Sequence, residues 1–196
     1  MSKVYLFIDG SNLYGAQYEL FGPQKYLNFS AFITIIESYL KRKFDEIYFY
    51  ASYSPVPKKP SKKQKLYLKN EALFYRSVKN TPHTVFFTGY RSKTSGKEKE
   101  VDVKLAVDIV DFAHRNYFGN IYLLSGDADF LQALVAVRKL KKKIYVLSLY
   151  NKIMYRAAFL FKTFVLYFDK NCSLHFDKNQ TVELVLMEKE KVVEEA

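Results

Sequence analysis

The sequence predicts an α/β protein, a three-layer α/β/α sandwich around a mostly parallel central sheet. Short apolar runs rich in β-branched and aromatic residues alternate with longer segments of helical spacing, which is the pattern of βαβ units. The runs are apolar at nearly every position, as is typical of parallel strands covered on both faces. With 196 residues, of which 49% are hydrophobic, the chain suits one domain with a substantial core.

The first half of the chain begins with a strand expected at Val4–Ile8. A second strand is expected at Ile47–Tyr53, after a helix at Ser30–Lys43. The segment Ser54–Pro60 has three prolines in seven residues, so we expect an exposed and fairly stiff loop there. A helix expected at Ser61–Val78 follows this loop directly.

The second half of the chain repeats the alternation. A strand expected at Thr84–Thr88 leads into a polar, basic loop at Arg91–Lys99. The pattern weakens after about residue 169, so we divide the chain into a domain over residues 1–168 and a C-terminal extension over 169–196 with a candidate edge strand and an acidic tail. The remaining expected elements are helices at Val101–Tyr117, Asp129–Lys141 and Lys152–Phe161, and strands at Ile121–Leu124, Ile144–Leu147, Phe164–Phe168 and Thr181–Met187.

Positive charge is concentrated in one part of the chain. The formal charge is +11, and the segment from Lys58 to Lys104 holds thirteen Lys and Arg against four Asp and Glu. This polarised charge favours a polyanionic partner, and a solvated lysine-rich surface is the alternative reading. The residues expected to bind nucleic-acid phosphates are Lys58, Lys59, Lys62, Lys63, Lys65, Arg91, Lys93, Lys97 and Lys99, with Tyr53, Tyr67 or Tyr90 available to stack on bases.

Cysteine content and hydropathy bear on the location of the protein. A single cysteine, Cys172, excludes an intramolecular disulfide, and with three widely spaced histidines it excludes a zinc cluster. No run of about 18 apolar residues occurs, and the apolar start of the chain is too short for the core of a signal peptide. We therefore expect a cytoplasmic protein without a membrane partner.

Two acidic residues stand at the ends of predicted strands. Asp9 directly follows the first strand, and Asp127 follows the fourth through Ser125-Gly126. Ligands of open parallel sheets bind beyond the carboxyl ends of the strands, so both carboxylates are expected at a binding crevice. The structural alternatives are that Asp9 shapes a turn, that Asn12 or Asp127 caps a helix, and that Asp129 is a first-turn acid matched to the helix dipole.

A third carboxylate, Asp102, is singled out by helical spacing. At about 100° per residue, Asp102 falls among the apolar residues of its helix, whereas Asp108 and Asp111 fall on the opposite, solvent-facing side. A buried carboxylate needs a strong partner, such as a cation. Three converging carboxylates without His or Cys favour Mg²⁺ or Mn²⁺, which would assist attack of water on a phosphodiester.

Three motifs occur in order along the chain: FIDGSNL at residues 7–13, KEVDVKLAVD at 99–108 and LSGDADF at 124–130. In these residues the chain resembles the NYN domain family, the branch of PIN-like nucleases related to bacterial LabA-like proteins. The resemblance covers roughly Val4 to Leu149. It implies the strand order 3-2-1-4-5 and metal-dependent ribonuclease activity.

The resemblance also implies roles for individual residues. Asp9, Asp102 and Asp127 would form the catalytic, metal-holding acidic core. The chain has Glu100 where many family members have glycine, and the fourth acid of many PIN domains has no clear counterpart, although Glu37 could occupy its place. The residues implied to support the site are Asn12, Ser125, Asp129 and Asp108.

The leading functional hypothesis is therefore a Mg²⁺- or Mn²⁺-dependent nuclease acting on RNA. A non-catalytic RNA-binding module with the same fold is the first alternative, and a phosphatase or nucleotide hydrolase is the second. DNA is not excluded by charge, because only contacts to the 2′-hydroxyl distinguish the two nucleic acids. The sequence also leaves open a homodimer that extends the basic groove.

Overall fold

The computed structural model describes residues 2–91, 98–149, 161–168 and 174–177. Its centre is an eight-stranded sheet in the order β4-β3-β2-β1-β5-β6-β7-β8, parallel except for the edge strands β4 and β8. The strands are β1 (Val4–Asp9), β2 (Glu46–Ser52), β3 (Thr84–Arg91), β4 (Glu98–Lys99), β5 (Asn120–Leu124), β6 (Lys143–Leu149), β7 (Lys162–Phe168) and β8 (Leu174–Asp177).

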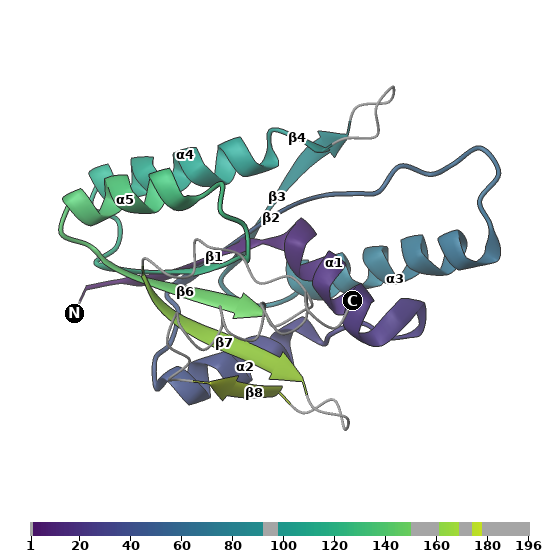
Figure 1. Ribbon diagram of the computed structural model, residues 1–196, viewed down its shortest axis with the longest axis horizontal. Coiled ribbons are helices and arrows are strands. Elements are labelled where there is room, and N and C mark those ends of the chain that lie inside the picture. Colours follow the sequence, from purple (N-terminus) through teal and green to yellow (C-terminus); the bar gives the residue numbers. More distant parts are fainter. Residues whose placement is uncertain (1, 92–97, 150–160, 169–173, 178–196) are drawn as a thin grey trace, which may run out of the picture.

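Helices cover both faces of this sheet (Figure 1). One face carries α4 (Val101–His114) and α5 (Leu131–Lys139). The other face carries α1 (Gly10–Phe21), α2 (Phe29–Leu40) and α3 (Lys62–Lys79), with a short 3₁₀ turn, η1 (Gly22–Gln24), after α1. Each face has its own hydrophobic core, so the structure is the expected three-layer sandwich. None of the helices in the described ranges is long and apolar enough to cross a membrane.

The predicted strand order 3-2-1-4-5 is confirmed, since it corresponds to β3-β2-β1-β5-β6. The six predicted strands up to Phe168 are all present, within a few residues of their expected bounds. The basic loop expected at Arg91–Lys99 is different: its two ends pair as the antiparallel strands β3 and β4. The candidate helix at Lys152–Phe161 and the candidate strand at Thr181–Met187 fall on segments outside the described residues.

Alternation along β1 fixes the direction of its last side chain. All six residues of β1 are buried, with Leu6 and Ile8 in the core under α1–α3 and Tyr5 and Phe7 in the core under α4 and α5. Because side chains alternate along a strand, Asp9 follows Phe7 toward the α4 face. Its neighbour in the β2 ladder is Tyr50, which belongs to the same core.

Candidate functional site

Asp9 lies at the carboxyl end of the central strand and is only 4% exposed. Its Oδ1 accepts a hydrogen bond from the backbone N–H of Asn12 at 3.0 Å, so Asp9, and not Asn12, is the N-cap of α1. Its Oδ2 accepts a hydrogen bond from the Ser125 hydroxyl at 3.0 Å. A buried carboxylate at a helix N-terminus is stabilised by both the hydrogen bonds and the helix dipole.

The loop after β5 is bound to the start of α1 through a chain of hydrogen bonds. The Ser125 Oγ that donates to Asp9 also accepts from the backbone N–H of Asp127 at 3.0 Å. Asn12 Oδ1 accepts from the N–H of Gly126 at 3.4 Å, and Asp127 Oδ1 accepts from the N–H of Asp129 at 3.0 Å. The structure thus brings together five residues expected at the site: Asp9, Asn12, Ser125, Asp127 and Asp129.

The structural alternative for Asp127, a helix cap, is wrong, because α5 begins later, with Phe130 at its N-cap position. The Asp127 carboxylate instead closes a turn by accepting from the second residue after it, as Asp side chains often do. Asp127 is half-buried and Asp129 is exposed. Their loop lies where the carboxyl ends of β1 and β5 are neighbours.

The rotation predicted for α4 is wrong. Asp102 is exposed in the first turn of the helix, and the buried residues are Val101, Leu105, Asp108 and Ile109. The apolar positions Leu105, Ile109 and Ala113 are buried as counted, but the buried face extends to Val101 and Asp108 and leaves Asp102 outside it. Figure 1 shows the start of α4 on the side of the sheet where the parallel strands end, so Asp102 stands at that edge.

Asp108 was expected on the solvent-facing side and is in fact 8% exposed. Its Oδ2 accepts a hydrogen bond from the Tyr50 hydroxyl at 2.8 Å, and its Oδ1 forms an ion pair with Lys104 one turn earlier. Hydrogen bonds and an adjacent cation offset the cost of burying the carboxylate. Because Tyr50 is the ladder neighbour of Asp9, Asp108 supports the position of a side chain directly beside the acidic site.

Ionisation of the tyrosines in this core is disfavoured. Burial, followed by the hydrogen bond to Asp108 and its negative charge, raises the pKa of Tyr50, and burial together with Tyr5 raises the pKa of Tyr48 to about 12. Above about pH 10 the unfolded chain releases phenolic protons that the folded chain keeps, so the stability must fall as the pH rises.

We therefore expect the free energy of unfolding to decrease from about pH 10 upward, and Tyr50→Phe to flatten that decrease by up to about 1.4 kcal/mol per pH unit. Urea unfolding at a series of alkaline pH values would measure both slopes. Unfolding of the same two proteins between pH 7 and 9, below the range in which a phenol titrates, is the control. Equal slopes in the wild type and Tyr50→Phe would contradict the prediction.

Sequence reasoning missed one buried acid at the same edge. Glu71 of α3 is 2% exposed and accepts from the backbone N–H and the hydroxyl of Ser54, at 2.9 and 2.7 Å. Ser54 follows the end of β2, so Glu71 fastens the loop before α3 at the carboxyl edge. Its position on the apolar face with Phe74 and Val78 was the available signal. Glu37, by contrast, lies at the other edge, where it binds Lys43 and the Phe44 N–H.

The donor set at this edge consists of oxygens alone. Within the described ranges no three His, Cys, Asp or Glu side chains lie close enough together to hold a metal ion. Ser125 nevertheless joins the Asp9 carboxylate to the backbone N–H of Asp127, and Mg²⁺ is commonly held by one or two carboxylates, with waters and substrate phosphates completing its shell. Carboxylates of this kind suit a hard cation that shares its coordination with a substrate, whereas the residues that the structure describes form no cage of three carboxylates.

Exposed lysines lie at the start of α3 and in the loop before it. Ser61 caps α3 in a reciprocal capping box with Gln64, so the helix begins abruptly after the proline-rich loop. Figure 1 shows this loop and the start of α3 projecting beyond the carboxyl edge of the sheet. The exposed side chains there are those of Lys58, Lys59, Lys62, Lys63 and Lys65.

The other expected nucleic-acid contacts have mixed outcomes. Arg91 and Lys99 contribute backbone to the β3–β4 hairpin, whereas Lys93 and Lys97 fall outside the described residues. Among the aromatics, Tyr53 and Tyr90 are exposed. Tyr67 is partly buried and packs edge-on against Tyr14 and Tyr18, so it is a core ring and not a free stacking surface.

Comparisons with known proteins agree with this geometry. The family model of the NYN domain matches residues 3–161. Among solved structures, a protein of unknown function from Vibrio parahaemolyticus has a similar fold, with a TM-score of 0.61 and 16% sequence identity over 89% of this chain and 96% of that chain. None of the curated proteins matches the sequence.

Proposed function

The chain belongs to the NYN domain family of PIN-like nucleases, and on that premise we propose that it is a ribonuclease whose cleavage depends on Mg²⁺ or Mn²⁺. The observation that supports this most directly is the link between Asp9 and the Asp127 loop through Ser125 at the carboxyl edge. Acidic groups at this edge of a parallel sheet lie where its ligands bind. The proposal includes a cytoplasmic location and RNA as the partner.

The cation would be held by Asp9 and Asp127, and when bound it would lower the pKa of a water ligand and offset charge on the phosphoryl oxygens. Ser125 keeps the Asp9 carboxylate in one orientation by donating to Oδ2, and Asn12 holds the Asp127 loop against α1. Asp102, which is exposed in the first turn of α4, would be available to orient a water or the ion. Asp108 acts through Tyr50 and is a positioning residue.

The lysines of the proline-rich loop and of the α3 start would bind the phosphates on either side of the cut. Each neutralised phosphate releases counterions, so RNA binding should weaken steeply with salt. These phosphate contacts do not depend on the RNA sequence. They position the RNA backbone but do not select bases. The exposed rings of Tyr53 and Tyr90 are the candidate stacking surfaces for bases.

A non-catalytic RNA-binding module is the second candidate function. It is favoured by one observation: the described residues form no cluster of three carboxylates that could hold a metal ion. Such a module would keep salt-dependent RNA binding and give no metal-dependent product.

The test is cleavage of end-labelled single-stranded RNA by the wild type and by Asp102→Asn in Mg²⁺, in Mn²⁺ and in EDTA. We expect cleavage only with metal, and a loss of about 10- to 100-fold in the variant with RNA binding retained, because an exposed carboxylate is removed without disturbing the fold. Asp111→Asn is the matched control, since it removes the same charge from the distal half of α4.

Each result separates the hypotheses. Metal-independent cleavage that is equal in all three proteins would indicate a contaminating nuclease and contradict the proposal. RNA binding with no product in any metal would favour the binding module. Hydrolysis of a small phosphoester such as p-nitrophenyl phosphate, with none of RNA, would support the phosphatase alternative.

A further inference from the structure

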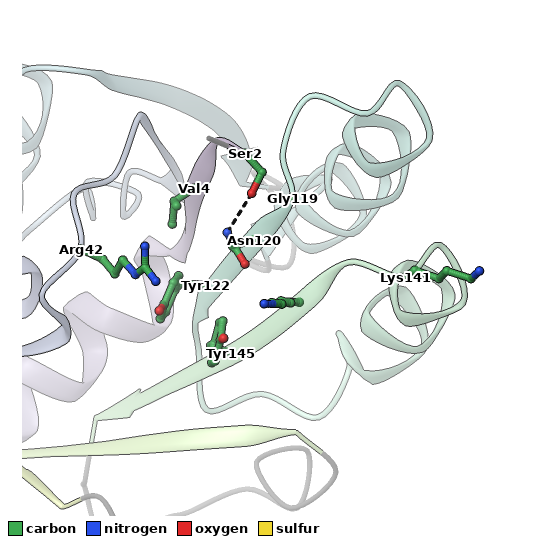
Figure 2. A pocket seen from close by; sticks show the side chains of 9 residues that line it. Ser2, Val4, Arg42, Gly119, Asn120, Tyr122, Lys141 and Tyr145 are labelled. Atoms are coloured by element: carbon green, nitrogen blue, oxygen red, sulfur yellow. Dashed lines mark hydrogen bonds between the residues drawn. The ribbon is translucent and has the colours of Figure 1, made fainter.

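A polar pocket lies at the amino edge of the sheet, opposite the acidic site. Its volume is about 350 Å³, at the lower end of the usual range for small-molecule sites. The first residues of three adjacent strands form its base: Val4 of β1, Asn120 of β5 and Lys143 of β6. Arg42, in the loop between α2 and β2, closes one side of it (Figure 2).

The charges around this pocket are unbalanced. Its lining includes Arg42, Lys141 and Lys143 and no carboxylate, and none of the ion pairs within the described ranges involves these three cations. One carboxylate lies beside the pocket, that of Asp45, and its Oδ2 accepts from the Val4 N–H at 2.7 Å. Lys141 stands at the rim, with its side chain directed away from the cavity in Figure 2.

Two stacked tyrosines form an aromatic wall of the pocket. The rings of Tyr122 and Tyr145 are nearly parallel, at 17°, with their centroids 4.6 Å apart. Tyr122 is 6% exposed, and Tyr145 is more open to solvent. Burial, followed by the neighbouring phenol of Tyr145, raises the pKa of the Tyr122 hydroxyl, and the positive charge of Arg42 opposes the rise. Figure 2 shows the Arg42 side chain reaching toward this ring.

Two lysines at or beside the pocket have left-handed backbone conformations, which are unfavourable for residues other than glycine. Lys41, directly before Arg42, has φ 50°, and Lys141 has φ 59°, both in the left-handed region. Lys41 is the C-cap of α2, and Lys141 follows the end of α5, positions where glycine is usually found because it has no Cβ. Two helices therefore end at this edge on lysines where glycine would be less strained.

From these observations we propose that the amino-edge pocket binds a nucleoside monophosphate. Arg42 and Lys143 would bind the phosphate, Asn120 would offer its amide to the sugar or base, and the Tyr145–Tyr122 wall would pack against the base. A guanidinium binds phosphate oxygens through two parallel hydrogen bonds, and aromatic side chains stack on any base. The site is separated from the acidic edge by the length of the strands, and this inference does not rest on the nuclease proposal.

The test is calorimetric titration of the full chain with AMP in EDTA, which keeps divalent ions from recruiting the phosphate to the acidic edge. We expect Arg42→Gln combined with Lys143→Gln to weaken AMP binding at least about tenfold, because two charge-assisted contacts are lost. Arg76→Gln combined with Lys25→Gln removes the same charge from exposed residues outside the pocket and should leave AMP binding unchanged. Circular dichroism would verify that each exposed double variant remains folded.

Further probes identify the ligand chemistry. Adenosine should bind at least about tenfold more weakly than AMP, and inorganic phosphate should bind more weakly than AMP because it does not contact the tyrosines. A 5′-phosphorylated tetranucleotide that binds where AMP does not would assign the pocket to an RNA end and overturn the mononucleotide. No AMP binding at millimolar concentration, or equal losses in the two double variants, would overturn the site itself.

Discussion

Replacing Asp9 with asparagine is expected to reduce metal-dependent RNA cleavage by about 10³-fold, because a carboxylate that would hold the cation loses its charge. The fold should remain, since asparagine is as good an N-cap as aspartate and its Oδ1 can still accept from the Asn12 N–H. The measurement is the cleavage rate at saturating RNA with a metal titration. Thermal unfolding of the same preparation would verify that the variant is folded.

Ser125→Ala is the matched comparison for Asp9→Asn. It keeps the Asp9 charge and removes only the hydroxyl that donates to Oδ2 and accepts from the Asp127 N–H. We expect a smaller loss of cleavage than in Asp9→Asn, together with a weaker apparent affinity for the metal. If Asp9→Asn cleaves RNA as the wild type does, the carboxyl edge has no part in the chemistry.

The strand-end acids could be predicted because their positions depend on local sequence. Asp9 and Asp127 each follow an apolar run, and the end of a parallel strand fixes the edge at which the next residue lies. The hydrogen bonds that join the two loops through Ser125 and Asn12 could not be read from the spacing, since these residues lie more than a hundred positions apart. The sequence therefore predicted correctly that both acids lie at the carboxyl edge of the sheet. It did not predict how the side chains at that edge are arranged.

The errors on α4 have a definite physical cause. An apolar count places the buried face from the apolar residues alone and does not consider what could hold a carboxylate, so it put Asp102 on that face and Asp108 on the opposite one. In the structure the Tyr50 hydroxyl, from a strand distant in the chain, and Lys104 satisfy the Asp108 carboxylate. Partners supplied by tertiary contacts are invisible to a periodicity count. For Glu71 the apolar face of α3 was a signal in the sequence, but its partner Ser54 was not.

The amino-edge pocket could not be predicted from the sequence either, because its lining residues are brought together only by the fold. Arg42, Tyr122 and Tyr145 come from different parts of the sequence, and no motif connects them. The charge count singled out the lysines after residue 58 because they are consecutive in the chain. Cations at the starts of several parallel strands lie far apart in the sequence, so a charge count along the chain does not detect them.

Gly10 directly follows Asp9 and is the first residue of α1. The close packing around it therefore affects both the stability of the fold and the position of the Asp9 carboxylate. A Cβ built on Gly10 would lie 2.1 Å from the ring of Phe49, which has no exposed surface and packs against Phe29 and Phe74. Contacts shorter than 3.0 Å require a shift. Because the ring is confined by other aromatic side chains, the start of α1 must move instead, and the Asp9 cap moves with it.

Gly10→Ala is therefore expected to destabilise the protein by about 1–3 kcal/mol and to reduce cleavage even below the unfolding temperature. Gly15→Ala is the control within the same helix: its Cβ would meet no atom within 4 Å, so the gain in helix propensity should stabilise the protein by up to about 1 kcal/mol. Urea unfolding and the cleavage rate would be measured for both variants. Equal stability of the two would mean that Phe49 yields easily, and that the glycine after Asp9 is not required by packing.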